Sequence, residues 1–285
     1  MGLSSYRLSS KTLFTRPKED TIKPKRVVFL STEGTKTEVQ YFRCVERFKE
    51  QLGINAIVHI EVLERNDTRS DVNSVLDLLD EYVYFRGNNK FEDIINSFSL
   101  KNFSIEFINA FKEDPSKLDK KEVRRFKEIL KEEHIDLLYL NFLNKYQGEE
   151  DIFGIVIDRD CGSHTLDQMT TIIEKCQQKG YHYFISNPCF EFWLLLHVSN
   201  VANEYSECIN KILANETDEK GNTFVSNLLF EKTGQRKAIQ VKVFEQYYLS
   251  NIDLAIERAK TFGEKDQLLD SVGTNIPELF EQLRQ

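Results

Sequence analysis

Short apolar runs predict several buried strands along this chain. Residues 27–30 form an apolar run that predicts a strand over residues 26–30 with apolar side chains on both faces, and the run at 153–157 predicts a second strand over residues 152–158. Such strands are typical of a parallel sheet that helices cover on each side. Residues 56–63 alternate between apolar and polar positions, which predicts another strand. Residues 181–186 are expected to form the next one.

Apolar residues at helical spacing lie between these strands. They predict helices over residues 35–52 and 72–84. Thr165 and Gln168 match a capping box, and Gly180 matches a C-cap glycine, so a helix is expected between these positions. After the last predicted strand, Pro188 is expected to open an almost wholly apolar helix with Asn187 as its cap.

This order of elements predicts an α/β fold, a mostly parallel sheet flanked by helices. Residues 26–65 and 152–234 form the expected core. Residues 66–151 lack a parallel-strand signal and contain predicted helices at 119–134 and 135–146, so we expect a helical insertion. Residues 235–285 are expected to form helices that pack on the core, at 238–248, 252–262 and 277–283. Residues 1–25 are polar and predict a flexible leader, with a docking arm as the alternative.

The composition narrows the class of protein. A chain of 285 residues can bury a core without disulfides. Its net charge of -8 argues against a general affinity for nucleic acid but leaves a local basic groove open. The five cysteines form no CxxC pair, which indicates a reducing cytoplasm and neither a disulfide framework nor a zinc site. No apolar run approaches the roughly 20 residues that span a bilayer, so no membrane association is expected.

Carboxylates follow two of the predicted buried strands. Glu33 and Glu38 come soon after residues 27–30, and the sequence Asp158-Arg159-Asp160 comes soon after residues 153–157. Ligands of open α/β sheets bind at the carboxyl ends of the strands. Several carboxylates meeting there would repel one another unless a cation lay between them, and oxygen ligands suit Mg²⁺ or Mn²⁺. The pattern predicts a metal-dependent phosphoryl-transfer or nuclease centre.

Each of these carboxylates also has a simpler interpretation. Asp158 and Asp160 would face the same way on an extended chain and hold metal together, or they would belong to a polar turn. Glu33 would bind metal or act as a general base on water. Glu38 completes a T-x-x-E capping box with Thr35. Its side chain would therefore either cap the helix or bind the metal.

Three further positions complete the candidate site. Glu191 lies in the apolar helix after Pro188, where a buried carboxylate is costly unless it is paired, protonated or bound to a cation. It would support the metal centre or form a salt bridge in the core. Lys36 and Lys237 would contact substrate phosphates, or they would be solvated lysines. His197 is expected to be a hydrogen-bonded core histidine.

Together these segments resemble the RloB family, whose core is similar to a Toprim domain. The family's blocks occur in order: residues 33–38, then 158–160, then Ser186-Asn187-Pro188-Cys189-Phe190-Glu191-Phe192-Trp193 with His197. The third block is long and specific. The resemblance covers residues 26–64 and 152–285, whereas residues 66–150 match nothing in the family pattern.

The resemblance implies a function. In Toprim enzymes a strand-end Glu and a DxD motif bind divalent metal and act on phosphodiesters, which would give these roles to Glu33, Asp158 and Asp160, with Glu38 and Glu191 as further candidates. RloB-like proteins are associated with prokaryotic restriction and phage-defence loci, often beside an ATPase. The chain is therefore expected to be a cytoplasmic Mg²⁺-dependent endonuclease, acting on DNA or RNA and controlled by an ATPase partner; self-association stays open. The alternatives are a Toprim-like regulator or scaffold that cuts nothing and a nucleotide-processing phosphotransferase.

Overall fold

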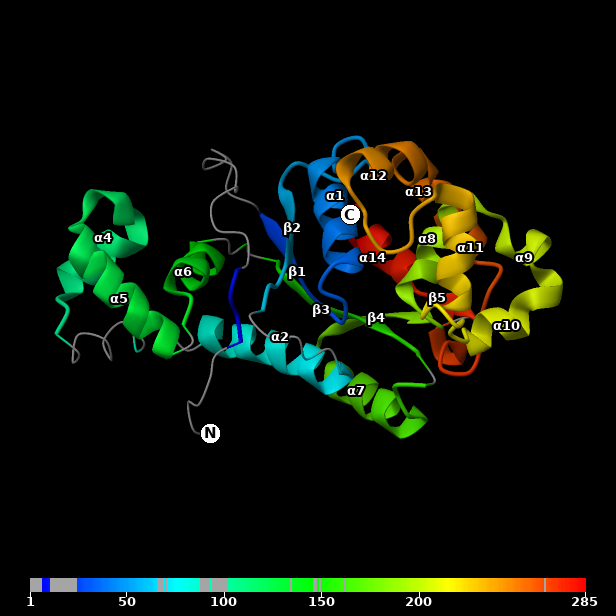
Figure 1. The fold of residues 1–285 in the computed structure, drawn as a ribbon, viewed down its shortest axis with the longest axis horizontal. Coiled ribbons are helices and arrows are strands. Elements are labelled where there is room, and N and C mark those ends of the chain that lie inside the picture. The colour runs from blue at the N-terminus through cyan, green and yellow to red at the C-terminus, as the bar shows by residue number, and fades with distance from the viewer. Residues whose placement is uncertain are drawn as a thin grey trace.

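A five-stranded sheet forms the centre of the computed structural model (Figure 1). The structure describes residues 7–10, 25–65, 69, 71–87, 93, 102–133, 135–145, 148, 150–160, 162–263 and 265–285. The strand order is β2-β1-β3-β4-β5. Strands β1 to β4 are parallel, and the short β5 runs antiparallel to β4. The bounds are β1 Arg26–Thr32, β2 Val58–Val62, β3 Ile152–Asp158, β4 His182–Asn187 and β5 Gly273–Thr274. The predicted mostly parallel α/β fold is confirmed.

Alternate residues of the central strands enter two separate cores. Val28 and Leu30 of β1 face one core, while Val27 and Phe29 face the other, because successive strand side chains point to opposite faces. This explains why residues 27–30 of the strand are all apolar. Figure 1 shows α2 and α7 over one face and α1, α14 and the C-terminal helices over the other.

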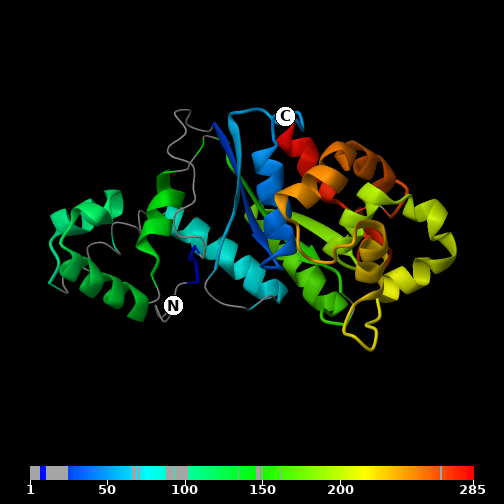
Figure 2. The ribbon, with the colours of Figure 1, turned by 45° about the horizontal axis from the view of Figure 1, so that its top comes forward.

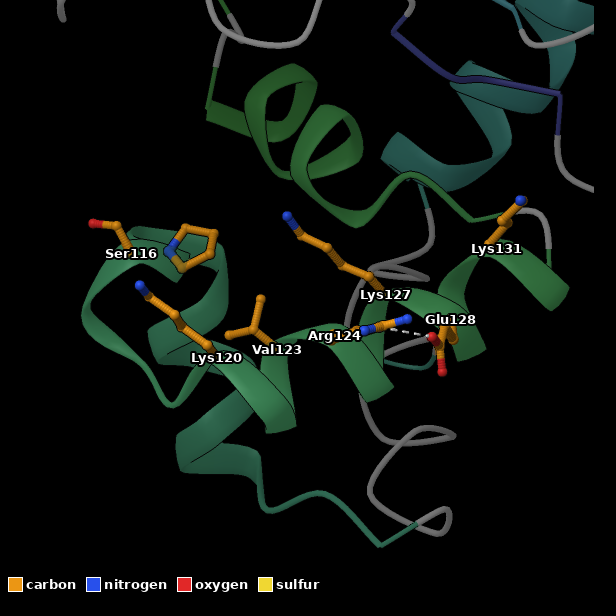
Figure 3. Close-up of a pocket in the computed structure, with 8 residues that line it drawn as sticks. Ser116, Lys120, Val123, Arg124, Lys127, Glu128 and Lys131 are labelled. Carbon is orange, nitrogen blue, oxygen red and sulfur yellow. Dashed lines mark hydrogen bonds and ion pairs between the residues drawn. The ribbon is translucent and has the colours of Figure 1, made fainter.

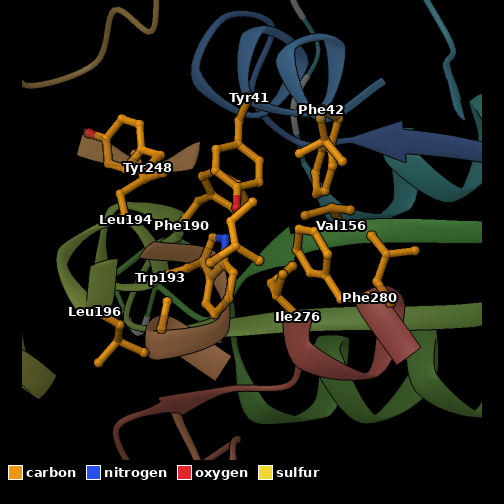
Figure 4. Packing of buried hydrophobic residues seen from close by; sticks show 14 of the residues in the cluster. Tyr41, Phe42, Val156, Phe190, Trp193, Leu194, Leu196, Tyr248, Ile276 and Phe280 are labelled. Atoms are coloured by element: carbon orange, nitrogen blue, oxygen red, sulfur yellow. The ribbon is translucent and has the colours of Figure 1, made fainter. Parts of the chain in front are cut away.

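The first core is rich in aromatic side chains and is built around α8 (Figure 4). Trp193 of α8 packs near Tyr41 of α1 and Phe280 of α14. The hydroxyl of Tyr41 lies 3.1 Å from Nε2 of His197, whose Nδ1 lies 2.9 Å from the carbonyl oxygen of Trp193. Burial lowers the pKa of His197 to about 3, so it is the hydrogen-bonded core histidine that the sequence predicted. The helices of this side are α1 Thr37–Arg47, α8 Phe190–Val198, α9 Val201–Glu204, α10 Ile209–Ala214, α11 Phe224–Thr233, α12 Val241–Tyr247, α13 Ile252–Ala259 and α14 Ile276–Leu283.

The second core joins the opposite face of the sheet to residues 66–151. Helix α2 (Val72–Gly87) packs on β1 and β3 and beside α7 (Leu166–Lys179), so this part of the predicted insertion is a layer of the core. Helices α4 (Ile105–Glu113) and α5 (Lys120–Glu132) lie away from the sheet, and α6 (Leu137–Lys145) lies between them and the sheet (Figures 1 and 2). The projecting part of the insertion is therefore α4 to α6.

Residues 7–10 of the predicted leader lie against this second core. Leu8 is fully buried and forms an isolated antiparallel bridge with Arg65. Oδ2 of Asp136, just before α6, accepts a 3.0 Å hydrogen bond from the amide of Ser10. This segment fits the docking-arm alternative. Residues 1–6 and 11–24 lie outside the described part of the chain.

Several predicted boundaries differ from the structure. The capping box at Thr165 and the left-handed Gly180 are both present. The opening of a helix at Pro188 is wrong: the N-cap is Cys189, and Asn187 ends β4 and donates its side-chain amide to the carbonyl of Leu268. Short 3-10 turns lie at Pro115–Lys117, Ser206–Cys208, Leu249–Asn251 and Lys265–Gln267. No helix in the described residues is both long and apolar enough to cross a membrane.

Candidate functional site

The strand register brings three chain segments together at the carboxyl edge of the sheet. The amide of Glu33, just after β1, donates to the carbonyl of Val156 in β3 at 3.0 Å. Asp158 ends β3 and is opposite Ser186 of β4, and α8 starts at Phe190, soon after β4 ends. The ends of β1 and β3 and the start of α8 therefore meet in one place.

The carboxylate of Glu33 is held on both of its oxygens. Oε2 accepts a hydrogen bond from the amide of Asp158 at 3.0 Å, and Oε1 lies 3.0 Å from Nε2 of His164. This hydrogen bond raises the pKa of His164, which favours the charged imidazolium beside the carboxylate. Arg159 is buried and donates to the carbonyls of His164 and Leu269. Arg159 thereby fixes the loop that carries His164.

Asp158 is the second carboxylate at this edge of the sheet. Its Oδ1 accepts a 2.9 Å hydrogen bond from the amide of Phe190, the first residue of α8. Burial raises the pKa of Asp158 well above its usual range, and the nearby charges of Glu38, Glu33 and Glu191 raise it further. The three glutamates are thus close enough to Asp158 for their charges to disfavour its ionised form.

Glu38 is buried in the first turn of α1 and contacts the turn that precedes the helix. Its Oε1 accepts a hydrogen bond from the amide of Gly34 at 3.0 Å. The predicted capping box with Thr35 is absent, because α1 begins at Thr37 and no side chain caps its N-terminus. Burial raises the pKa of Glu38 to about 7, with the charges of Glu191 and Glu33 adding to the effect.

Gly34 is required for this position of Glu38. A Cβ atom at Gly34 would lie 2.0 Å from Oε2 of Glu38, far inside van der Waals contact. Any other residue at this position would therefore displace the carboxylate.

Glu191 completes the cluster from the first turn of α8. It is buried, and its charge raises the pKa of Asp158, Glu38 and Cys189. Within the residues that the structure describes, no Arg or Lys side chain forms an ion pair with it. Of the two roles left open for Glu191, a place in the carboxylate cluster fits this environment, and a core salt bridge does not. We name Glu33, Glu38, Asp158 and Glu191 the carboxylate cluster.

Asp160 has different surroundings. It is exposed, its Oδ1 accepts from the amide of Gly162 at 2.9 Å, and its Oδ2 accepts from the hydroxyl of Ser163 at 2.9 Å. These contacts are those of the polar-turn alternative, so its role as a metal ligand stays a prediction.

The two candidate phosphate-binding lysines come from segments in contact with each other. Lys36 and Lys237 are both exposed. The hydroxyl of Thr37 donates to the carbonyl of Lys237 at 2.9 Å, which ties the segment before α12 to the start of α1. Two other basic residues close to Lys237 in the sequence contact other parts of the protein: Lys232 pairs with Glu204, and Arg236 lies 3.9 Å from the ring centre of Phe230.

His164 is the site residue that sequence reasoning missed. Its one signal was a CxxH pair with Cys161, which indicates zinc too weakly to be used, and Cys161 lies outside the described residues. The contact between His164 and Glu33 joins residues 131 positions apart. Only the register of β1 against β3 brings them together.

The donor atoms of the carboxylate cluster match a hard divalent cation in chemistry. Carboxylate oxygens are the ligands that Mg²⁺ and Mn²⁺ prefer, and burial, with the charges of neighbouring carboxylates adding to it, raises the pKa of Glu38 and Asp158. Among the described residues, however, no group of three or more His, Cys, Asp or Glu side chains is arranged so that it could hold a metal ion. Glu33, Glu38 and Asp158 each accept a backbone hydrogen bond instead, so cation binding would require these side chains to turn.

One comparison with known proteins gives a match. A family model described as RloB-like protein matches residues 28–283. This range runs through residues 66–150, so the expectation that they lie outside the family pattern is wrong. No curated protein and no solved structure matches the chain.

Proposed function

The chain belongs to the RloB-like family, and from this membership and the carboxylate cluster we propose that it is a Mg²⁺- or Mn²⁺-dependent nuclease. The observation that carries the proposal is the convergence of four carboxyl groups at the carboxyl edge of a parallel sheet, with the pKa of Glu38 raised to about 7 and that of Asp158 raised well above its usual range. Sites that keep like charges together at this cost are typical of function.

The cluster's residues would have distinct roles. Glu33, oriented by His164 and by the amide of Asp158, would accept a proton from the attacking water. Asp158 and Glu38 would be the principal metal ligands, with Glu191 beside them. A bound divalent cation would stabilise the negative charge that develops on the phosphodiester oxygens. Lys36 and Lys237 would hold the phosphates on either side of the scissile bond.

The biological setting comes from the family resemblance. The chain would be the effector of a prokaryotic antiviral system, held inactive by an ATPase partner in the cytoplasm until infection. The raised pKa of Glu38 and Asp158 supports a resting state in which the cluster is partly protonated.

Cleavage of labelled DNA and RNA with Mg²⁺ or Mn²⁺ tests the proposal. Glu33→Gln and Asp158→Asn should each lose at least about 100-fold in rate, the usual contribution of a positioned base. Glu50→Gln, a change at an exposed glutamate, is the matched control and should keep full activity. Equal cleavage rates in wild type and all three variants would contradict the proposed nuclease function.

A second function, a regulator or scaffold that cuts nothing, is favoured by one observation. The described residues hold no preassembled metal-binding group, and the carboxylates of Glu33 and Asp158 are hydrogen-bonded within the protein. A defence assay separates the two functions. Asp158→Asn would abolish protection by a nuclease, whereas a scaffold that still co-purifies with its ATPase would keep it.

A further inference from the structure

Helix α5 of the insertion carries a stripe of cations. Lys120, Arg124, Lys127 and Lys131 follow one another at intervals of four, three and four residues, so they share one face of the helix. All four are exposed. At a rise of 1.5 Å per residue the stripe is about 16 Å long. We name these four residues the basic stripe.

The charge of the basic stripe is only slightly neutralised. Arg124 lies 3.3 Å from Glu128, but both side chains are largely exposed, and such pairs contribute little. In the described part of the chain no carboxylate pairs with the stripe's three lysines. Helix α5 has six cationic and three anionic side chains in a protein whose net charge is -8. The positive charge is therefore local and opposite in sign to that of the whole chain.

The stripe borders a concave surface (Figure 3). A hollow of about 460 Å³ lies along α5 and reaches Pro115 and Ser116. A second hollow of about 410 Å³ lies between α5 and residues 135–138 and reaches Ser9 and Ser10. Lys127 and Lys131 line both hollows, so the two are neighbours along the stripe.

A chain of contacts connects the second hollow to the carboxylate cluster. Ser10, which lines that hollow, donates its hydroxyl to Glu64 at 3.2 Å. The next residue, Arg65, donates to the carbonyls of Thr32 and Glu33. Arg43 of α1 pairs with Glu64, and both line a small pocket that also includes Gly34. The basic stripe thus lies on the side of the protein where β1 and β2 end.

We propose that the basic stripe and its two hollows bind the sugar–phosphate backbone of a nucleic-acid strand and lead that strand to the carboxylate cluster. A 16 Å stripe is as long as about five nucleotides of a helical strand measured along the helix axis, at roughly 3.4 Å each. Contacts of Lys and Arg with phosphates are independent of base sequence. This surface explains how an acidic protein engages an anionic polymer. The inference extends the proposed function, but strand binding itself needs neither the metal nor cleavage.

Fluorescence polarisation tests the proposal with the full-length protein in EDTA. Labelled 20-nucleotide RNA and DNA, single- and double-stranded, are titrated over a range of salt concentrations. Lys127→Ala/Lys131→Ala is compared with Lys211→Ala/Lys220→Ala, which removes the same charge from exposed sites in another part of the fold. Because all four lysines are exposed, both variants should keep the wild-type melting temperature.

The stripe variant should bind roughly 10- to 30-fold more weakly at 0.15 M salt, as expected when two phosphate contacts are lost. Its salt slope should fall by about 1.4 to 1.8, while the control matches wild type. Equal affinities and slopes for the two variants would overturn the proposal. It would also be overturned if wild type bound none of these nucleic acids. The binding assay contains EDTA and therefore tests strand binding without cleavage. If the protein binds a strand in this assay but does not cut it when Mg²⁺ is added, the result contradicts the proposed nuclease function and leaves the strand-binding proposal intact.

Discussion

Replacing Glu38 by glutamine should stabilise the protein at alkaline pH. In the folded state the pKa of Glu38 is raised from 4.5 to about 7, first by burial and then by Glu191 and Glu33. The folded protein therefore binds the proton more tightly than the unfolded chain does. The stability linked to this group is fully present below pH 4.5 and is lost as the pH rises through 7.

The size of the effect follows from the shift. A difference of about 2.5 pKa units corresponds to roughly 3 kcal/mol at pH 8. Glutamine keeps an oxygen that can accept from the amide of Gly34 and carries no charge. For 285 residues the unfolding entropy near the midpoint is about 0.6 kcal/mol/K, so the melting temperature should rise by roughly 5 °C.

Thermal and urea unfolding of wild type and Glu38→Gln between pH 5 and pH 8.5 measures this difference, in EDTA. The advantage of the variant should be largest at pH 8 and small at pH 5. Glu50→Gln, at an exposed site, should give no such difference. A Glu38→Gln protein that is no more stable at pH 8, or whose advantage does not change with pH, would refute the reasoning about the cluster.

Three other predictions concern single side chains. Gly34→Ala should push the carboxylate of Glu38 out of its site and lower its pKa from about 7 towards 4.5, which a ¹³C NMR titration would detect; an unchanged pKa contradicts the steric argument. Glu33→Gln should lower the pKa of His164, because glutamine removes the negative charge that favours the imidazolium while burial remains; a histidine titration by ¹H NMR decides this. Burial lowers the pKa of His59, but its contacts with Glu46 and Glu61 outweigh burial and raise the pKa to about 9. The protonated His59 therefore contributes at most about 3 kcal/mol to the free energy of unfolding. This contribution is complete below pH 6.5 and is lost as the pH rises through 9. The stability difference between wild type and His59→Gln should shrink over that interval, and a constant difference would contradict the assignment.

Periodicity predicted the parallel part of the sheet well. The strand predicted at 152–158 has those bounds in the structure, and β1 continues only two residues beyond its predicted end. Both strands have an uninterrupted apolar centre, residues 27–30 and 152–157, because the two cores lie on either side of them. Where burial alone determines the pattern, the sequence is a sufficient guide.

Short elements held by distant contacts were not predicted. Strand β5 has two residues, too few for any alternation, and it exists because Thr274 pairs with Ser186 of β4. Helix α8 begins at Phe190 instead of Pro188, since the amide of Phe190 is used by the carboxylate of Asp158. Local capping rules cannot anticipate a partner that lies 32 residues away.

The candidate site could be predicted only in part, because some of its contacts depend on distant segments of the chain. Glu33 and Asp158 could be placed together because each directly follows a buried strand of a parallel sheet. Glu38 had two interpretations in the sequence: the capping box with Thr35 is absent, because Glu38 accepts from the amide of Gly34 instead, and the role as a metal ligand stays a prediction. His164 and the turn contacts of Asp160 depend on a loop conformation that no spacing rule encodes.

The electrostatic cost of the carboxylate cluster requires a rigid support, and α8 provides it. This helix delivers the amide of Phe190 and the side chain of Glu191 to the cluster from its first turn. Its apolar side chains are buried on nearly every side, Trp193 and Leu195 among them. Full burial of one such side chain contributes about 1.5–3 kcal/mol, so one or two of them offset the roughly 3 kcal/mol linked to Glu38. An apolar helix next to four carboxylates is thus a physical requirement of the site, because without that packing the first turn of α8 would move and relieve the repulsion.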